Sequence, residues 1–232
     1  MAIARDSAGT TITATGLATS ITRAHTCTGS DVVLFASCET ATITTDNITD
    51  ATYNGVSFLA NRIGLAQFTN GGDANTYLYW SAEGTGSGAG ENCVFTCSTA
   101  DVFRAYTASY TGVDQTSPVD ASTTNNTDTV SGVEEATTIT TVTASNCWAH
   151  MVTANNFGTP VAGTNATWLT TGTSTGYGCF DSNGTISTGS FTMGWQIAAT
   201  TGQGTVLVAF KPAGGGGGGS ATPTQMLMGM GT

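Results

Sequence analysis

The stretch Cys147-Trp-Ala-His-Met-Val152 decides the fold class. Successive side chains of a β-strand point to opposite faces, so Trp148, His150 and Val152 share one face. The other face carries Cys147, Ala149 and Met151. Both faces are largely apolar, as expected for a central strand in a two-layer core. We therefore expect an all-β protein built as a two-layer antiparallel β-sandwich or jelly roll.

Two further stretches support this interpretation. Thr76-Tyr-Leu-Tyr-Trp80 places its two tyrosines opposite Leu78 and Trp80 across a strand. Thr205–Phe210 is an apolar run followed by Lys211-Pro212. Because proline cannot continue a central strand, this run is expected to be the last core strand of the domain.

Short strands recur along the chain, separated by Gly, Asn, Asp and Ser. Asn54-Gly55 is the strongest hairpin signal, because this dipeptide suits a tight turn between strands. About twelve such strands indicate a sandwich or jelly roll, and no internal repeat of fixed period is found. The expected strands are Thr11–Ala14, Ile21–Cys27, Asp31–Ser37, Ala51–Tyr53, Val56–Leu59, Ile63–Phe68, Thr76–Trp80, Cys93–Ser98, Val102–Tyr110, Thr138–Val142, Cys147–Thr153, Ser190–Ile197 and Thr205–Phe210.

Length and composition predict one β domain with extensions. A chain of 232 residues rich in Thr and Gly fits a single β-sandwich. We expect an N-terminal arm at 1–10, the sandwich domain at 11–213, an oligoglycine tether at 214–219 and a Met-rich docking tail at 220–232. Low-complexity loops are expected at 111–137 and 154–189, where a sandwich would carry a binding site.

The charge excludes several partners. Five basic residues stand against fifteen acidic ones, for a net charge of −10. Binding to a phosphate backbone needs clustered Lys and Arg, so we expect neither nucleic acid nor an anionic membrane as partner. The start of the chain lacks the apolar core of a signal peptide, and no apolar run is long enough for a transmembrane helix. Synthesis in a cytoplasm is therefore expected.

The residues for catalysis or metal binding are sparse. His25 and His150 are the two histidines, each in a predicted strand, where a core role is expected. We expect the six cysteines to be buried thiols. The alternative is a zinc site that uses Cys93-x3-Cys97. The acidic and amide residues at 46–50 and 181–184 could bind calcium. They are equally explained by hydrogen bonds to the backbone of ordinary turns. We expect no enzyme activity, no catalytic residue, no metal site and no cofactor.

The C-terminal tail predicts an assembly contact. Gly214–Gly219 spans at most ~20 Å when extended. It is followed by adaptable apolar side chains that nothing nearby in sequence covers. The partner-binding residues of the tail are expected to be Met226, Leu227, Met228 and Met230.

Aromatic residues offer a second type of site. Trp168 and Tyr177 lie in the loop-rich stretch 154–189 and are the candidate glycan-binding residues, since sugars stack on aromatic rings. Trp80, Trp148 and Trp195 lie in predicted strands and are expected in the core. A core role for Trp168 is the competing interpretation.

Several short motifs mark strand and turn positions. They are Thr52-Tyr-Asn-Gly-Val56, Tyr79-Trp80, Ser109-Tyr-Thr-Gly-Val-Asp-Gln-Thr-Ser-Pro-Val-Asp120, Thr141-Val142, Asn146-Cys-Trp148 and Val208-Ala-Phe-Lys-Pro212. In these motifs the chain resembles a broad group of β-sandwich proteins of tailed phages and bacterial surfaces, with a lectin-like jelly roll. The likeness covers about residues 10–212 and implies fold more directly than function.

The resemblance and the tail together imply a structural virion protein. The expected role is that of a capsid decoration (cement) protein on the outer surface of a tailed phage. Its partners would be the major capsid protein, copies of itself as a homo-oligomer such as a trimer, or both. The alternative is a head- or tail-fibre module that binds a cell-surface receptor or glycan, and a carbohydrate-active enzyme is a third hypothesis.

Overall fold

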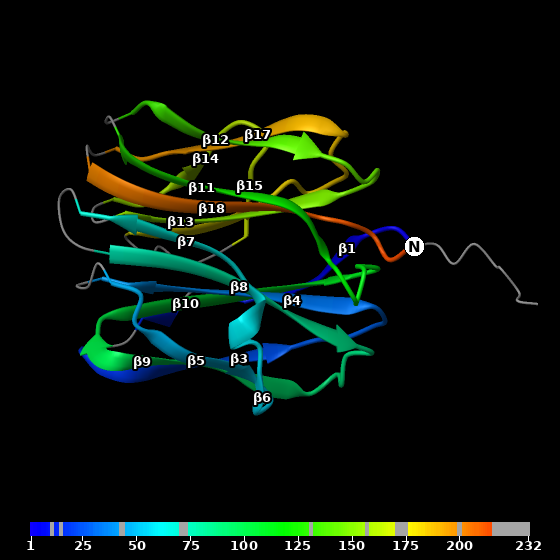
Figure 1. Ribbon diagram of the computed structural model, residues 1–232, viewed down its shortest axis with the longest axis horizontal. Helices are drawn as coiled ribbons and strands as arrows, with labels where there is room; N and C mark the ends of the chain where they lie inside the picture. Colours follow the sequence, from blue (N-terminus) through cyan, green and yellow to red (C-terminus); the bar gives the residue numbers. More distant parts are fainter. Residues whose placement is uncertain are drawn as a thin grey trace, which may run out of the picture.

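The fold is all-β, as predicted. The computed structural model describes residues 1–9, 12–13, 16–41, 45–69, 74–129, 132–155, 158–169, 176–198 and 201–214. Its strands form four antiparallel sheets, with one short 3-10 turn, η1, at Leu59–Asn61. The sheets are stacked in four layers, so the predicted antiparallel sandwich is present and is extended by further sheets (Figure 1).

The first half of the chain forms two of the sheets. The first inner sheet has the order β1-β10-β4-β8-β7, with β2 also on β10, and the first outer sheet has the order β3-β9-β5-β6. These strands are β1 Ala4–Ala8, β2 Ile12–Thr13, β3 Ala18–Thr26, β4 Val32–Thr40, β5 Ile48–Tyr53, β6 Val56–Ser57, β7 Arg62–Phe68, β8 Ala74–Gly84, β9 Gly90–Asp101 and β10 Phe103–Thr111.

The second half of the chain forms the other two sheets. The second inner sheet has the order β11-β18-β13-β16-β15, and the second outer sheet has the order β12-β17-β14. These strands are β11 Val119–Thr129, β12 Glu134–Val142, β13 Trp148–Asn155, β14 Val161–Ala162, β15 Thr167–Trp168, β16 Tyr177–Asp181, β17 Gly189–Gln196 and β18 Thr201–Phe210.

The two halves have the same topology. In each, the first, eighth, third, sixth and fifth strands form the inner sheet, and the second, seventh and fourth form the outer one, if β2 and β6 are set aside. This winding is that of an eight-stranded jelly roll. The protein is therefore a tandem pair of jelly rolls, and the single-sandwich prediction missed the repeat because it lies in the topology and not in a fixed sequence period.

Matching side chains support the correspondence. Asp6 and Asp120 each occupy an irregularity in the pairing of the first strand with the last. Asp6 accepts hydrogen bonds from the backbone N–H (2.9 Å) and the hydroxyl of Thr28. Asp120 accepts from the N–H and the hydroxyl of Thr143, both at 2.7 Å. The same bulge thus fastens the same loop in both jelly rolls.

The inner sheets pack on each other and are covered on both faces. One core lies between the two inner sheets, and one lies between each inner sheet and its own outer sheet. As a result every residue of β4 and of β13 is buried. Trp148 and Val152 face the central core while Cys147 and Met151 face the second outer sheet, which is the division that their alternation predicted.

Contacts across the central core are reciprocal. By strand register Phe35 corresponds to His150, and Tyr110 corresponds to Phe210. Phe35 lies 4.8 Å from Phe210, and the matching pair Tyr110 and His150 lies at 6.0 Å, between ring centroids. Reciprocal pairs of this kind are typical of a twofold interface, so the two jelly rolls face each other like the subunits of a dimer.

Three local predictions are corrected. Residues 4–8 are not a free arm but strand β1, paired with β10 and anchored beside the buried Ile3. The expected loop at 111–137 contains strand β11 and the start of β12, because its many threonines suit a sheet with one exposed face. The stretch 154–189 likewise contains β14, β15 and β16.

Candidate functional site

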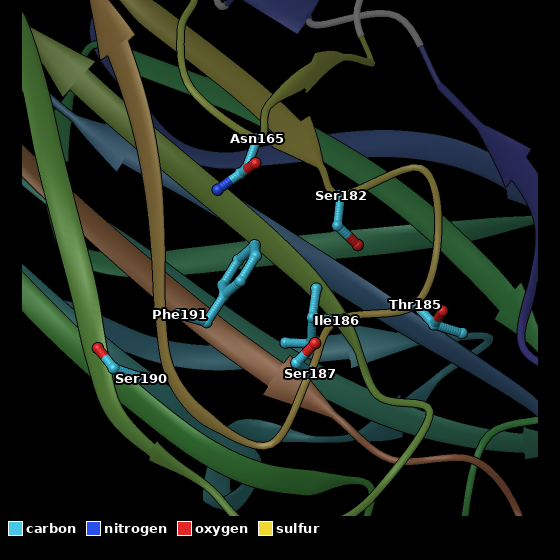
Figure 2. A pocket seen from close by; sticks show the side chains of 7 residues that line it. All are labelled: Asn165, Ser182, Thr185, Ile186, Ser187, Ser190 and Phe191. Atoms are coloured by element: carbon cyan, nitrogen blue, oxygen red, sulfur yellow. The ribbon is translucent and has the colours of Figure 1, made fainter.

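A pocket of about 340 Å³ opens on the second jelly roll. It lies between the turn that precedes β15, the β16–β17 loop and the start of β17. Figure 2 shows Phe191 in the middle of the group, with the other side chains around it. The lining residues are Asn165, Ser182, Thr185, Ile186, Ser187, Ser190 and Phe191.

The pocket exists because β14 is short. Phe191 corresponds to Phe95, since they pair with Ile139 and Ile21 respectively. In the first jelly roll β5 pairs with Phe95 through Ala51, and Phe95 is completely buried. In the second, β14 pairs with Gln196 and Trp195 and ends before it reaches Phe191, which is half-buried.

The first jelly roll also fills the equivalent space with an aromatic ring. Phe58, which follows β6, packs edge-on against Phe95 at 6.1 Å between centroids. The second half has no strand equivalent to β6 among the residues that the structure describes. Loss of that cover leaves the Phe191 ring as the floor of the pocket.

The walls of the pocket are held by local hydrogen bonds. Asn165 adopts a left-handed conformation (φ 56°), and its Nδ2 donates to Thr192 O at 2.9 Å. In the β16–β17 loop, the Ser182 hydroxyl donates to Gly184 O at 2.6 Å and accepts from Ala149 N–H. Ile186 N–H donates to Cys147 O at 2.8 Å. The pocket is therefore built on fixed backbone.

The rim consists of neutral polar groups. Thr185, Ser187 and Ser190 are exposed. Their hydroxyls have no hydrogen-bond partner within the described part of the chain. No lining residue carries a charge. The pocket thus offers hydroxyl and amide groups around an apolar floor.

The two predicted glycan-binding residues do not come together on the surface. Tyr177 is completely buried in the central core, where its hydroxyl donates to Ser37 Oγ, so its prediction as a surface contact is wrong. Trp168 is half-buried and packs edge-on against Phe180 at 4.7 Å between centroids. Phe191 was missed because it lies in a predicted strand and only the shortening of β14 uncovers it.

Both histidines are buried in hydrogen-bonded networks. His25 contacts Ser109 Oγ and Thr107 Oγ1, each at 2.9 Å, and burial lowers its pKa to about 4. His150 contacts Tyr110 at 3.0 Å and stacks on Phe35, and burial lowers its pKa to about 3. Both imidazoles are therefore neutral at physiological pH.

The cysteines are free and buried, as the sequence indicated. Burial raises the pKa of the Cys147 thiol to about 12 and that of Cys179 well above its usual range. Within the described ranges no group of three His, Cys, Asp or Glu side chains could hold a metal ion. Asp181, at one proposed calcium segment, is instead paired with Arg5 at 2.7 Å.

Ala213, near the end of the described residues, lies beside Met1. The Met1 ammonium lies 3.4 Å from Ala213 O. A second pocket, of about 470 Å³, lies at this end and is lined in part by Met1, Asp114, Lys211 and Gly214. The predicted tail residues Met226, Leu227, Met228 and Met230 lie outside the described residues.

Comparisons with known proteins give no relative. No protein-family model, no curated protein and no solved structure matches the chain. No helix within the described residues is long and apolar enough to cross a membrane.

Proposed function

We propose that the protein is a structural component of a tailed-phage virion, a decoration protein on the outer surface of the capsid. Jelly rolls occur in viral capsid proteins and in lectins, so the fold is compatible with this role without fixing it. The observation that carries the proposal is the position of Ala213 and Gly214, after which the tail follows in the sequence.

Met1 and Gly214, the first and last described residues, lie together at one end of the stacked sheets. Met1 and Ala213 are in contact, and Gly214 lines the pocket beside them. Gly214, the first residue of the proposed tether, therefore has a defined position next to Asp114 and Lys211. A segment attached there, with glycines followed by apolar side chains, can reach a neighbouring subunit while the jelly rolls stay outside the shell.

The energetics require a shared interface. Burying the four apolar side chains of the tail contributes ~1.5–3 kcal/mol each. Ordering the six glycines costs about 1–2 kcal/mol per residue. These terms nearly cancel, so the surface around the second pocket must also contact the partner. The partner in this proposal is the major capsid protein, a second copy of the chain, or both.

Truncation tests the proposal. The full chain, a chain that lacks 214–232 and a chain with Met226, Leu227, Met228 and Met230 replaced by serine are added to particles that lack the protein. We expect both altered chains to keep the wild-type unfolding transition and to lose at least ten-fold in occupancy on the particle. Unchanged occupancy of the truncated chain contradicts docking by the tail.

A further inference from the structure

We propose that the pocket on the second jelly roll is a binding site for a neutral saccharide. The site lies on the rim of an outer sheet and uses residues that the proposed docking end does not, so it stands apart from the decoration role. Its ligand would be an uncharged sugar unit of a polysaccharide or surface glycan.

The chemistry of the lining matches a sugar ring. A pyranose has an apolar C–H face and a rim of hydroxyls, and aromatic rings with a few convergent polar groups are the usual partners in such sites. Phe191 provides the aromatic surface and Ile186 extends it. Thr185, Ser187 and Ser190 provide hydroxyls that can both donate and accept.

Charge narrows the class of ligand. No acidic or basic side chain lines the pocket. The whole chain carries a net charge of −10, which disfavours uronate, sulfate or phosphate groups. An ammonium ligand would need a carboxylate or an aromatic cage, and the lining has one aromatic ring. A neutral hexose or a similar unit fits this lining best.

Size and rigidity agree with this assignment. The volume of about 340 Å³ lies at the lower end of ligand pockets, which span ~300–1,000 Å³. The turn at Asn165 and the loop that carries Ser182 and Ile186 are held by the hydrogen bonds described above. A site fixed before binding loses less conformational entropy when the ligand enters.

Comparison of the two jelly rolls shows that the pocket is a feature of the second one alone, among the described residues. The same framework position is an aromatic ring in both halves, Phe95 and Phe191. The first half seals that ring with Ala51 and Phe58, while the second leaves it open below a hydroxyl rim. Because the framework is common to both, the open ring is not required by the fold.

The test uses native electrophoresis of the full chain in gels that contain dextran, mannan, galactomannan or, as the acidic comparison, alginate. We expect at least one neutral polysaccharide to retard the protein and alginate to leave its mobility unchanged. Ser187→Trp, which fills the pocket from its exposed rim, should weaken retardation at least ten-fold. Thr22→Trp adds the same ring at an exposed position of β3, in the first jelly roll, and should have no effect.

A second pair of variants separates binding from folding. Thr185→Ala combined with Ser190→Ala removes two rim hydroxyls from exposed positions and should weaken binding without changing the unfolding temperature. The proposal is overturned if no neutral polysaccharide retards the wild type, if only alginate does, or if Ser187→Trp binds as the wild type does.

Discussion

Replacing Arg5 with methionine should loosen the contact between the two jelly rolls. Arg5 belongs to β1 and binds Asp181 of β16 through two hydrogen bonds, of 2.9 and 2.7 Å. The Asp181 carboxylate is completely buried, while the Arg5 side chain is 31% exposed. Tyr110 O–H and Asn183 N–H also donate to Asp181, at 3.2 and 3.0 Å. Methionine keeps the length of the side chain and leaves the carboxylate without its counter-ion.

Removal of one partner of a buried ion pair usually costs about 3–5 kcal/mol. Here water reaches the guanidinium and two donors remain on Asp181, so we expect a loss of ~2–3 kcal/mol in the free energy of unfolding. For a chain of this size that corresponds to a decrease in Tm of roughly 4–12 °C. Urea unfolding followed by tryptophan fluorescence measures the change.

The matched control is Arg62→Met, because Arg62 pairs with Asp46 at the surface, where the two side chains are 37% and 40% exposed. That pair should contribute less than ~1 kcal/mol. In a double-mutant cycle, Asp181→Asn should recover part of the loss caused by Arg5→Met. An Arg5→Met protein within ~0.5 kcal/mol of the wild type would refute the reasoning. Two separate unfolding transitions in the wild type would refute the shared core.

Three further predictions follow from buried groups and close approaches. His150→Phe should make the free energy of unfolding less sensitive to acid. His150 has a pKa of about 3 in the folded protein and about 6.5 in the unfolded chain. The stability that neutral His150 contributes is therefore present above about pH 6.5 and is lost as the pH falls. Between pH 7 and pH 5 the free energy of unfolding of the variant should therefore fall by ~2 kcal/mol less than that of the wild type. Urea titration at each pH measures this, and equal decreases would contradict the prediction. Gly86→Ala should destabilise the protein by ~1–3 kcal/mol, because a Cβ there would lie 2.4 Å from the backbone of Cys27, whereas Gly16→Ala, in open space, should be neutral. Finally, a thiol reagent such as dithionitrobenzoate should react with none of the six cysteines in the native protein and with all six in guanidinium, and fast reaction of a native thiol would contradict their burial.

Much of the local structure was predictable from alternation. The division of Tyr77 and Leu78 between two cores is as the sequence indicated. The number of layers could not be predicted. A strand that is apolar on both faces has the same sequence pattern whether its second face packs on a sheet of its own domain or on a second domain. The repeat left a faint trace in Ala18-Thr-Ser-Ile-Thr22 and Ala136-Thr-Thr-Ile-Thr140, which occupy corresponding strands.

The candidate site was predictable only in its region. The stretch 154–189 contains most of the pocket residues, as expected of a loop-rich segment. Trp168 and Tyr177 were predicted as binding residues because they are the aromatic residues of this stretch. In the folded chain, however, the Tyr177 side chain lies in the central core. Phe191 becomes accessible because β14 is shorter than its counterpart β5, a difference that appears only when the two halves are compared in space.

The most direct test of the proposed virion role is copy number. Quantitative mass spectrometry of purified particles should find this chain at a simple ratio to the major capsid protein, near one or a simple fraction of it. A few copies per particle would instead place it in a fibre or tail structure, with the pocket as its receptor site. Complete absence from the particles would contradict the proposed function.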